Sequence, residues 1–331
     1  MSRMSANLES YVVRPPRKVE SAITLIQCTV PASRVFSCDG AYVQTIRIDV
    51  EKQQHERVGL HAPSACALSI DECYLYVADT YNDRVCVFDA SSGVYRHSFG
   101  SRGSGDKHFR IPTDVCVSNA GWLYVCDFCN NRVQVLDSIT GAHIRTIGKD
   151  ARRGGAGKLN GGPCKVAVSR EQVYVYEYQA GRVSVFSELD GRFLRSFAAV
   201  PSDSDFRYFR NIAVSPVSGN VLVADISANQ IRVLNASGEV QQIPYKTMTH
   251  GGVIQSVKHV CVSMVGDVYV CDDGFGTGCV HVFDSTGAHV RTIRDDASQP
   301  SIQLLGPVCT TVSRDGRLFI VDHGNCVRVF N

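Results

Sequence analysis

Carboxylate side chains recur along this 331-residue chain at intervals of 47–50 residues, each at the end of a short apolar run. They are Asp79, Asp127, Glu177, Asp225, Asp272 and Asp322. If the repetition arranges them in a ring, their oxygens are the ligand type that divalent cations prefer. Asn82 and Asn131 follow two of them at turn spacing, and Arg84 and Arg132 come one or two residues later. Because carboxylates in such turns accept backbone N–H groups and pair with arginine, we predict a structural role for all six.

Four histidines precede apolar runs and form a second candidate set: His61, His108, His250 and His259. Histidines that meet at one point can hold a zinc ion with an open coordination position. Such a site would make the protein a metal-dependent lyase or hydrolase, which is our second alternative function. Scattered histidines in polar loops are the ordinary expectation, however. We therefore predict no bound metal, no cofactor and no catalytic residue.

Cationic side chains gather in a third set of loops, the segments that join one repeated unit to the next. The candidates are Arg102, Lys107, Arg110, Lys149, Arg152, Arg153, Lys158, Arg207, Arg210 and Lys246. Basic, glycine-rich loops can follow a phosphate backbone, and aromatic side chains beside them can stack on bases. Asp83, Asp150 and Asp203 lie in loops on the same side and dilute the positive field. RNA binding is therefore our first alternative function.

The composition excludes several broad classes of protein. The 34 Lys and Arg residues against 32 Asp and Glu give a net charge of +2, so no chain-wide basic field is present. We find no apolar stretch of signal-peptide type at the N-terminus and no window approaching 18 uninterrupted apolar residues. Most of the 14 cysteines lie inside apolar runs, where they behave as small hydrophobic residues. We expect an intracellular, cytoplasmic protein without a membrane partner.

The elements that position these side chains are short β-strands in a repeated unit. The segment Leu75–Asp89 recurs in similar form at Leu123–Asp137 and more loosely in four later copies. Each unit contains four short alternating runs separated by Gly, Asn, Asp and Ser turns. The first run of each unit is apolar and small, as at Ala65–Ala67 and Val115–Val117. Four strands in 47–51 residues predict the blades of an all-β propeller built from four-stranded antiparallel sheets.

The ends of the chain decide the predicted blade count. Pro16 lies 47 residues before Pro63, which opens a clear unit, so we count a weak first unit and favour seven blades, with six as the alternative. The last unit ends after its third strand, and Tyr11–Val13 can supply the missing outer strand. Pairing of N-terminal and C-terminal strands would then close the ring. The predicted organisation is an N-terminal segment at 1–15 and a single propeller at 16–331.

The repeated Tyr-Val-Ala-Asp, Asn-Asp-Arg-Val and Phe-Asp elements resemble NHL repeats, most closely over residues 61–148. NHL repeats form the propellers of some RNA-binding and ubiquitin-ligase-associated proteins. The resemblance implies a propeller, usually of six blades, and it leaves the function open because propellers serve many roles.

We expect a non-catalytic interaction platform or adaptor that binds a protein partner through the loops of one propeller face. A few aromatic or arginine side chains commonly dominate such interfaces. The aromatic candidates, chosen by position, are Tyr81, Phe128, Tyr208 and Phe275.

Overall fold

The computed structural model describes residues 42–47, 59–148, 157–198, 209–226, 229–241, 254–274, 278–294 and 304–331. All of them belong to one compact unit, Ser37–Asn331. Their regular structure consists of β-strands and two short 3₁₀ turns, η2 (Thr80–Asn82) and η3 (Phe128–Asn130). The all-β prediction is therefore confirmed. None of the helical turns in these residues has the length or apolar character needed to cross a membrane.

The strands form six antiparallel sheets, which are the blades. The first blade contains β2 (Pro63–Leu68), β3 (Tyr74–Asp79), β4 (Arg84–Asp89) and β5 (Tyr95–Phe99). The second contains β6 (Pro112–Val117), β7 (Trp122–Asp127), β8 (Arg132–Asp137) and β9 (His143–Ile147). The third contains β10 (Pro163–Ser169), β11 (Gln172–Glu177), β12 (Arg182–Ser187) and β13 (Phe193–Ala198). The fourth, with three strands in the described residues, contains β14 (Phe209–Val214), β15 (Val221–Asp225) and β16 (Gln230–Leu234). The fifth contains β17 (Val257–Val262), β18 (Val268–Asp272), β19 (Cys279–Phe283) and β20 (His289–Arg294). The sixth contains β21 (Pro307–Val312), β22 (Leu318–Asp322), β23 (Cys326–Phe330) and β1 (Tyr42–Ile46).

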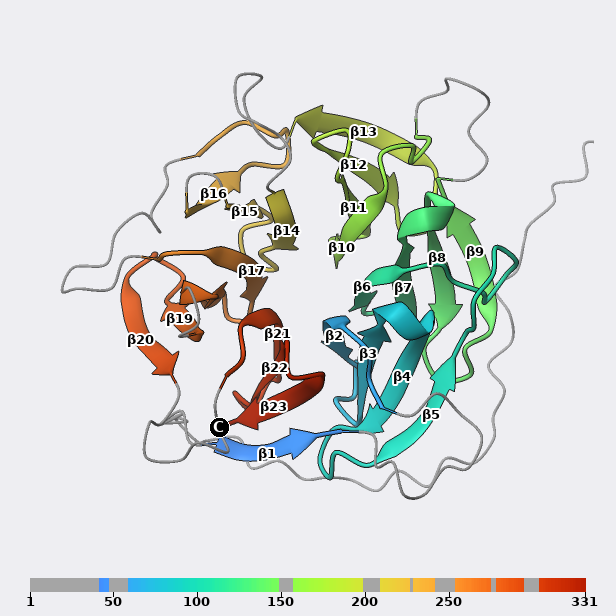
Figure 1. Cartoon of the computed structure of the whole chain (residues 1–331). Helices are drawn as coiled ribbons and strands as arrows, with labels where there is room; N and C mark the ends of the chain where they lie inside the picture. The colour runs from blue at the N-terminus through green and yellow to red at the C-terminus, as the bar shows by residue number, and fades with distance from the viewer. Residues whose placement is uncertain are drawn as a thin grey trace, which may run out of the picture. The chain divides into compact units, whose positions relative to one another are not determined.

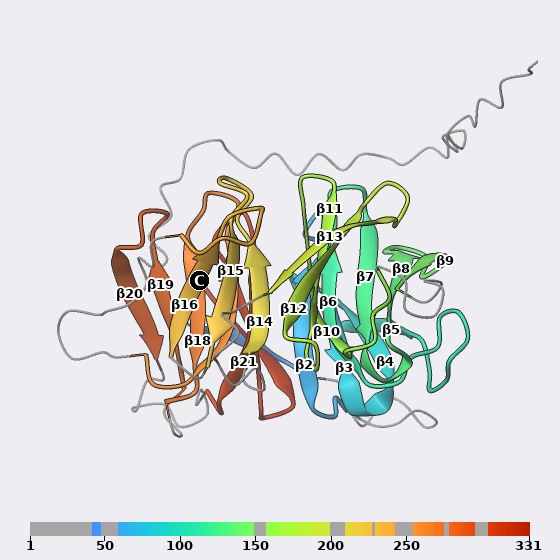
Figure 2. The same cartoon turned by 90° about the horizontal axis from the view of Figure 1, so that it is seen from above.

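The innermost strands close a ring of six blades. Each inner strand contacts the next in the order β2, β6, β10, β14, β17, β21, and β21 returns to β2 (Figure 1). Figure 2 shows that the strands run between the two faces of this ring. The preferred count of seven blades is wrong and the six-bladed alternative is confirmed. The physical reason is that β2 and β21 already touch, so the ring has no gap for another sheet.

An N-terminal strand completes the last blade, as predicted, although a different segment does so. β1 pairs antiparallel with β23 and supplies the outer strand of the β21–β23 sheet. Ile46 lies opposite Val327 in this ladder and is buried. The place that we assigned to Tyr11–Val13 is therefore occupied by residues of the supposed first unit. Tyr11–Val13 itself, like the whole segment 1–15, lies outside the described residues.

A β-bulge recurs at the start of every inner strand. In each blade the register shifts at the second residue, as between Pro63 and Ala65 or between Pro112 and Asp114. The same shift occurs in β10, β14, β17 and β21. A bulge leaves its extra residue out of the ladder and redirects the side chain. The second residue of each inner strand is thereby freed from pairing at one end of the ring.

Buried polar side chains on the inner strands connect neighbouring blades, which the apolar reading of these strands did not predict. Asp114 accepts a hydrogen bond from the Val166 amide of the next blade at 2.8 Å, and Asn211 accepts one from Val260 at 3.0 Å. Each inner strand is the edge of its sheet, so amides facing the channel have no partner in their own ladder. At Val166 and Val260 a polar side chain of the preceding blade satisfies such an amide.

Aspartates also stabilise the turns between third and fourth strands. Asp89 Oδ1 accepts the amides of Ser91 and Ser92 at 3.1 and 2.9 Å, and Oδ2 pairs with Arg96 at 2.7 Å. The Arg96 guanidinium and the Ser91 hydroxyl hold the pKa of the Asp89 carboxyl below its usual value of 3.8.

Asp89→Asn is expected to lower the melting temperature by about 1–3 °C near neutral pH. A carboxyl whose pKa is depressed by folding stabilises the protein above its unfolded pKa, and this contribution is lost as the pH falls through the folded pKa. The difference between wild type and variant should therefore disappear in strong acid. Thermal unfolding followed by circular dichroism from roughly pH 7 to pH 2 measures it. A difference that persists unchanged in acid would contradict the assignment.

Candidate functional site

The six recurring carboxylates lie at the ends of the second strands and are all buried. Five pair with an arginine of the third strand at Nε–oxygen distances of 2.6–2.7 Å. These pairs are Asp79–Arg84, Asp127–Arg132, Glu177–Arg182, Asp225–Arg232 and Asp322–Arg328. In the fifth blade Asp272 instead contacts His281. We name the end of the ring that holds these residues the carboxylate face.

These carboxylates also hold the loops that arrive from the preceding blades. Asp79 accepts the His61 amide at 2.7 Å, and Asp127 accepts the Arg110 amide at 2.7 Å. Asp272 accepts the amides of Gln255 and Ser256 at 2.8 and 2.7 Å. The geometry favours the structural interpretation of Asp79, Asp127 and Asp272, because each of these three fixes a loop relative to a strand.

A pocket of about 480 Å³ lies on the carboxylate face where inner strands of different blades begin. Its floor and walls include the redirected second residues of five inner strands, which are Ser64, Thr113, Cys164, Lys258 and Val308. Hydroxyl groups tie this rim together across blades. Ser64 Oγ donates to the Thr113 carbonyl at 2.9 Å, and Thr80 Oγ1 donates to the Pro112 carbonyl at 2.8 Å. The bulges and these bonds build a preformed hollow at the centre of the face.

Aromatic side chains form one part of the pocket wall: Tyr81, Phe128 and Tyr178. Tyr81 is 58% exposed, whereas the other two are half-buried. The rings of Phe128 and Tyr178 lie 6.5 Å apart between centroids. Gly162, at φ +65°, lets Phe128 approach, because a Cβ there would stand 2.6 Å from the ring. The wall offers apolar area with phenol hydroxyls at its edge.

The cations of the pocket are neutralised by neighbouring carboxylates. Lys165 Nζ lies 3.2 Å from Asp114, and Lys258 Nζ lies 3.3 Å from Asp273. Burial lowers the pKa of the Lys165 ammonium, but the Asp114 carboxylate outweighs it and the net shift is upward. Burial also raises the pKa of the Asp114 carboxyl. Because each lysine lies in close contact with a carboxylate, the positive field inside the pocket is weak.

The structure brings together some of the predicted contact residues. Tyr81 and Phe128 line the same pocket, and Tyr81 also lines a smaller hollow of about 250 Å³ with Arg102 and Arg110. Lys107 is exposed, and its amide donates to Gln134. Lys158 is half-buried, and its carbonyl accepts from Arg182.

Several predicted contact residues lie outside the described residues, and their roles stay predictions. They are Lys149, Arg152, Arg153, Arg207, Lys246, Tyr208, Phe275 and His250. Of Arg210, only its place in β14 is described.

The candidate histidines occupy different surroundings. His61 is exposed and packs edge-on against Tyr81 at 5.1 Å, and His108 is exposed with its ring near the Asp106 carbonyl. His259 is buried on β17 beside Cys309 Sγ at 3.3 Å. Within the described residues, none of the three belongs to a cluster of three metal-ligating side chains.

Sequence reasoning missed Tyr178, Lys165 and four of the redirected inner-strand residues, which are Ser64, Thr113, Cys164 and Val308. Tyr178 directly follows Glu177 just as Phe128 directly follows Asp127, so aligning the repeats residue by residue identifies it. The bulges carry a weaker signal, since proline opens four of the six inner strands. Pro63, Pro112, Pro163 and Pro307 mark where the ladder begins.

Comparison with known proteins gives a family match for one segment of the chain. Residues 109–136, which cover β6 to most of β8, match the family model described as NHL repeat. The NHL resemblance is thus confirmed, and the six-bladed ring agrees with it. Among curated proteins, none matches the sequence.

Solved structures with the same architecture include several enzymes. Hydrazine synthase of Kuenenia stuttgartiensis aligns with a TM-score of 0.54 at 17% identity, covering 82% of this chain and 77% of that one. Virginiamycin B lyase from Staphylococcus aureus aligns with a TM-score of 0.56 at 9% identity, covering 87% of this chain and 88% of that one. A gluconolactonase of Xanthomonas campestris aligns with a TM-score of 0.59 at 16% identity, covering 87% of this chain and 97% of that one. At these identities the likeness establishes the fold alone.

Proposed function

We propose that this NHL-repeat propeller is a non-catalytic interaction platform that binds a protein partner on its carboxylate face. The central pocket is the anchor point, and it takes one or two apolar or aromatic side chains of a partner segment. The observation that carries the proposal is the convergence of Tyr81, Phe128 and Tyr178 on one preformed hollow of about 480 Å³. Aromatic anchors in desolvated pockets supply most of the energy of many protein interfaces.

The charge of the pocket favours a protein segment over a phosphate chain. Lys165 and Lys258 already have carboxylate partners, so a polyanion would have to compete with Asp114 and Asp273 for them. Affinity for nucleic acid depends on releasing counterions from uncompensated cations. The pocket therefore suits a neutral, apolar group better than a phosphate.

RNA binding is the second candidate, and a neighbouring hollow favours it. Arg102 and Arg110 are exposed beside Tyr81 there, which combines cations with a ring that can stack on a base. Asp83 also lines this hollow and reduces its charge. Binding that RNase removes would favour this candidate over a protein partner.

The experiment is affinity capture from cells that produce the protein. It compares the partners retained by wild type with those retained by a Tyr81→Ala, Phe128→Ala double variant. Truncating two anchor side chains is expected to weaken retention of the partner by about tenfold or more. The matched control is Ile139→Ala, Leu189→Ala. Both residues are exposed in turns at the far ends of β8 and β12, on the opposite face.

The proposal holds if a protein retained by wild type and control is lost by the pocket variant with RNase present. It fails if the pocket variant keeps every partner of the wild type. If RNase abolishes the capture of every partner, the propeller binds RNA rather than a protein.

A further inference from the structure

The fifth blade departs from the other five at its buried carboxylate. In those blades an arginine guanidinium of the third strand meets the carboxylate at 2.6–2.7 Å. In the fifth blade the corresponding positions of β19 hold Cys279 and His281. Asp272, Cys279 and His281 are 2%, 5% and 1% exposed, so this carboxylate is as deeply buried as the others. A buried carboxylate needs a cationic partner or an equivalent set of hydrogen bonds.

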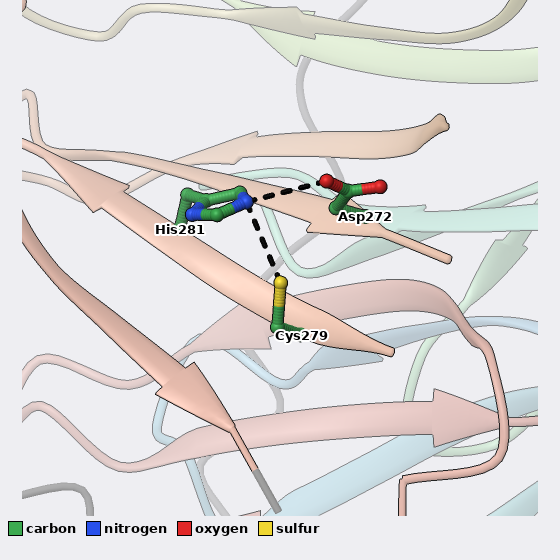
Figure 3. Close-up of side chains that lie close together, drawn as sticks. All are labelled: Asp272, Cys279 and His281. Carbon is green, nitrogen blue, oxygen red and sulfur yellow. Dashed lines mark hydrogen bonds and ion pairs between the residues drawn. The ribbon is translucent and has the colours of Figure 1, made fainter. Parts of the chain in front are cut away.

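The three side chains lie close together, and Asp272 and Cys279 both point toward the same ring nitrogen of His281 (Figure 3). His281 Nε2 lies 3.3 Å from Asp272 Oδ2 and 3.4 Å from Cys279 Sγ, and all three ligand atoms lie within 4.8 Å of one another. Bond lengths of about 2.0–2.1 Å to nitrogen and oxygen and about 2.3 Å to sulfur place neighbouring ligand atoms of a tetrahedral zinc ion about 3.3–3.6 Å apart. The two separations measured from His281 Nε2, 3.3 Å to Asp272 Oδ2 and 3.4 Å to Cys279 Sγ, are close to that spacing. The nitrogen–oxygen separation is also longer than the arginine contacts of the other blades.

Outer contacts orient these ligand atoms. His281 Nδ1 lies 2.9 Å from Thr292 Oγ1, so a histidine that donates there presents the lone pair of Nε2 to the centre. The hydroxyl of Thr292 in turn lies 3.0 Å from His289 Nε2. Backbone amides of Gln255, Ser256 and Gly274 hold the Asp272 carboxylate. In metal sites, hydrogen bonds of this kind to the ligand side chains fix the tautomer of histidines and the orientation of carboxylates.

We propose that Asp272, Cys279 and His281 bind a zinc ion that takes the place of the missing arginine. The Cys279 thiol gives up its proton to solvent, the resulting thiolate binds the ion, and neutral His281 and ionised Asp272 complete three of four tetrahedral positions. The donor set of sulfur, nitrogen and oxygen suits zinc better than calcium or magnesium. The ion links β18 to β19 and stabilises this blade. The site is separate from the pocket and does not depend on the proposed binding function.

The sixth blade provides a natural reference for this site. Asp322 and Cys326 face each other across β22 and β23 as Asp272 and Cys279 do across β18 and β19. Arg328 then stands where His281 stands, and its Nε donates to Asp322 at 2.6 Å. A single exchange of arginine for histidine therefore separates the two arrangements.

The test is the zinc content of the full chain, purified under reducing conditions and reconstituted with zinc. Wild type is expected to hold about one zinc ion per chain and to bind cobalt(II) with a thiolate-to-metal absorption band. Cys279→Ser and His281→Arg should lose both signals. His281→Arg copies the sixth blade, so it should remain folded without metal, and circular dichroism checks this. Cys326→Ser, the matched cysteine control, should keep zinc and the cobalt band.

A chelator should lower the melting temperature of wild type and leave that of His281→Arg unchanged. The proposal is overturned if reconstituted wild type holds neither zinc nor the cobalt–thiolate band. It is equally overturned if folded His281→Arg retains as much zinc as wild type.

Discussion

Arg132→Ala is expected to lower the free energy of unfolding by about 3–5 kcal/mol, because it leaves the Asp127 carboxylate charged and buried without its partner. Arg132 Nε lies 2.7 Å from Asp127, and the side chains are 1% and 0% exposed. The same guanidinium donates to the carbonyls of Gly105 and His108 at 2.7 and 2.8 Å. The substitution therefore also releases the loop that arrives from the preceding blade. Urea unfolding monitored by tryptophan fluorescence and circular dichroism measures the change.

Arg96→Ala is the control, since Arg96 pairs with Asp89 at the same 2.7 Å but on the surface. Exposed pairs contribute little, so we expect only a small shift of the unfolding midpoint, far below that of Arg132→Ala. Combining Arg132→Met with Asp127→Asn should recover part of the lost stability. The amide carries no charge and still accepts from the Arg110 backbone. Equal effects of Arg132→Ala and Arg96→Ala would show that the buried carboxylate pairs do not stabilise the propeller.

Ile46→Ala is expected to cost about 2–5 kcal/mol, the range for truncating a buried aliphatic side chain. Ile46 is 1% exposed and packs in the same apolar cluster as Val327 and Val329 of β23. It anchors β1, the outer strand of the sixth blade, so its loss also weakens the pairing between the two ends of the described chain. Denaturant unfolding reports the loss.

Val43→Ala, on the same strand but 44% exposed, is the matched control. We expect a change within about 0.5 kcal/mol, as for most surface substitutions. If both variants lost the same free energy of unfolding, pairing of β1 with β23 would not stabilise the sixth blade.

The sequence predicts the blades well because their signal is local. Alternation of apolar residues, turn glycines and the acidic end of the second strand repeat in each unit, and predicted strands such as His143–Ile147 coincide with observed ones. The blade count failed because it rests on long-range pairing. An alternating run such as Tyr42–Ile46 looks the same whether it belongs to a complete blade or completes another one.

The candidate site was only partly predictable for a similar reason. Tyr81 and Phe128 were found from their positions in the repeat, and Tyr178 follows from the same position. The buried inner ring was not found, because Asp114 and Lys165 each look like isolated polar residues in an apolar run. Their purpose appears only when the ring places each inner strand beside the next and leaves edge amides to satisfy. The exchange of arginine for His281 is visible in the repeats, but the spacing of its three ligand atoms comes from the structure.

The central claim, that the carboxylate face binds a protein, is tested most directly by site-specific photocrosslinking in cells. A photoreactive amino acid replaces Tyr81 in one sample and Leu189, on the opposite face, in another. The account predicts a discrete, nuclease-resistant protein adduct at position 81 that is absent at position 189. The same adducts at both positions, or only nucleic acid at position 81, would contradict it.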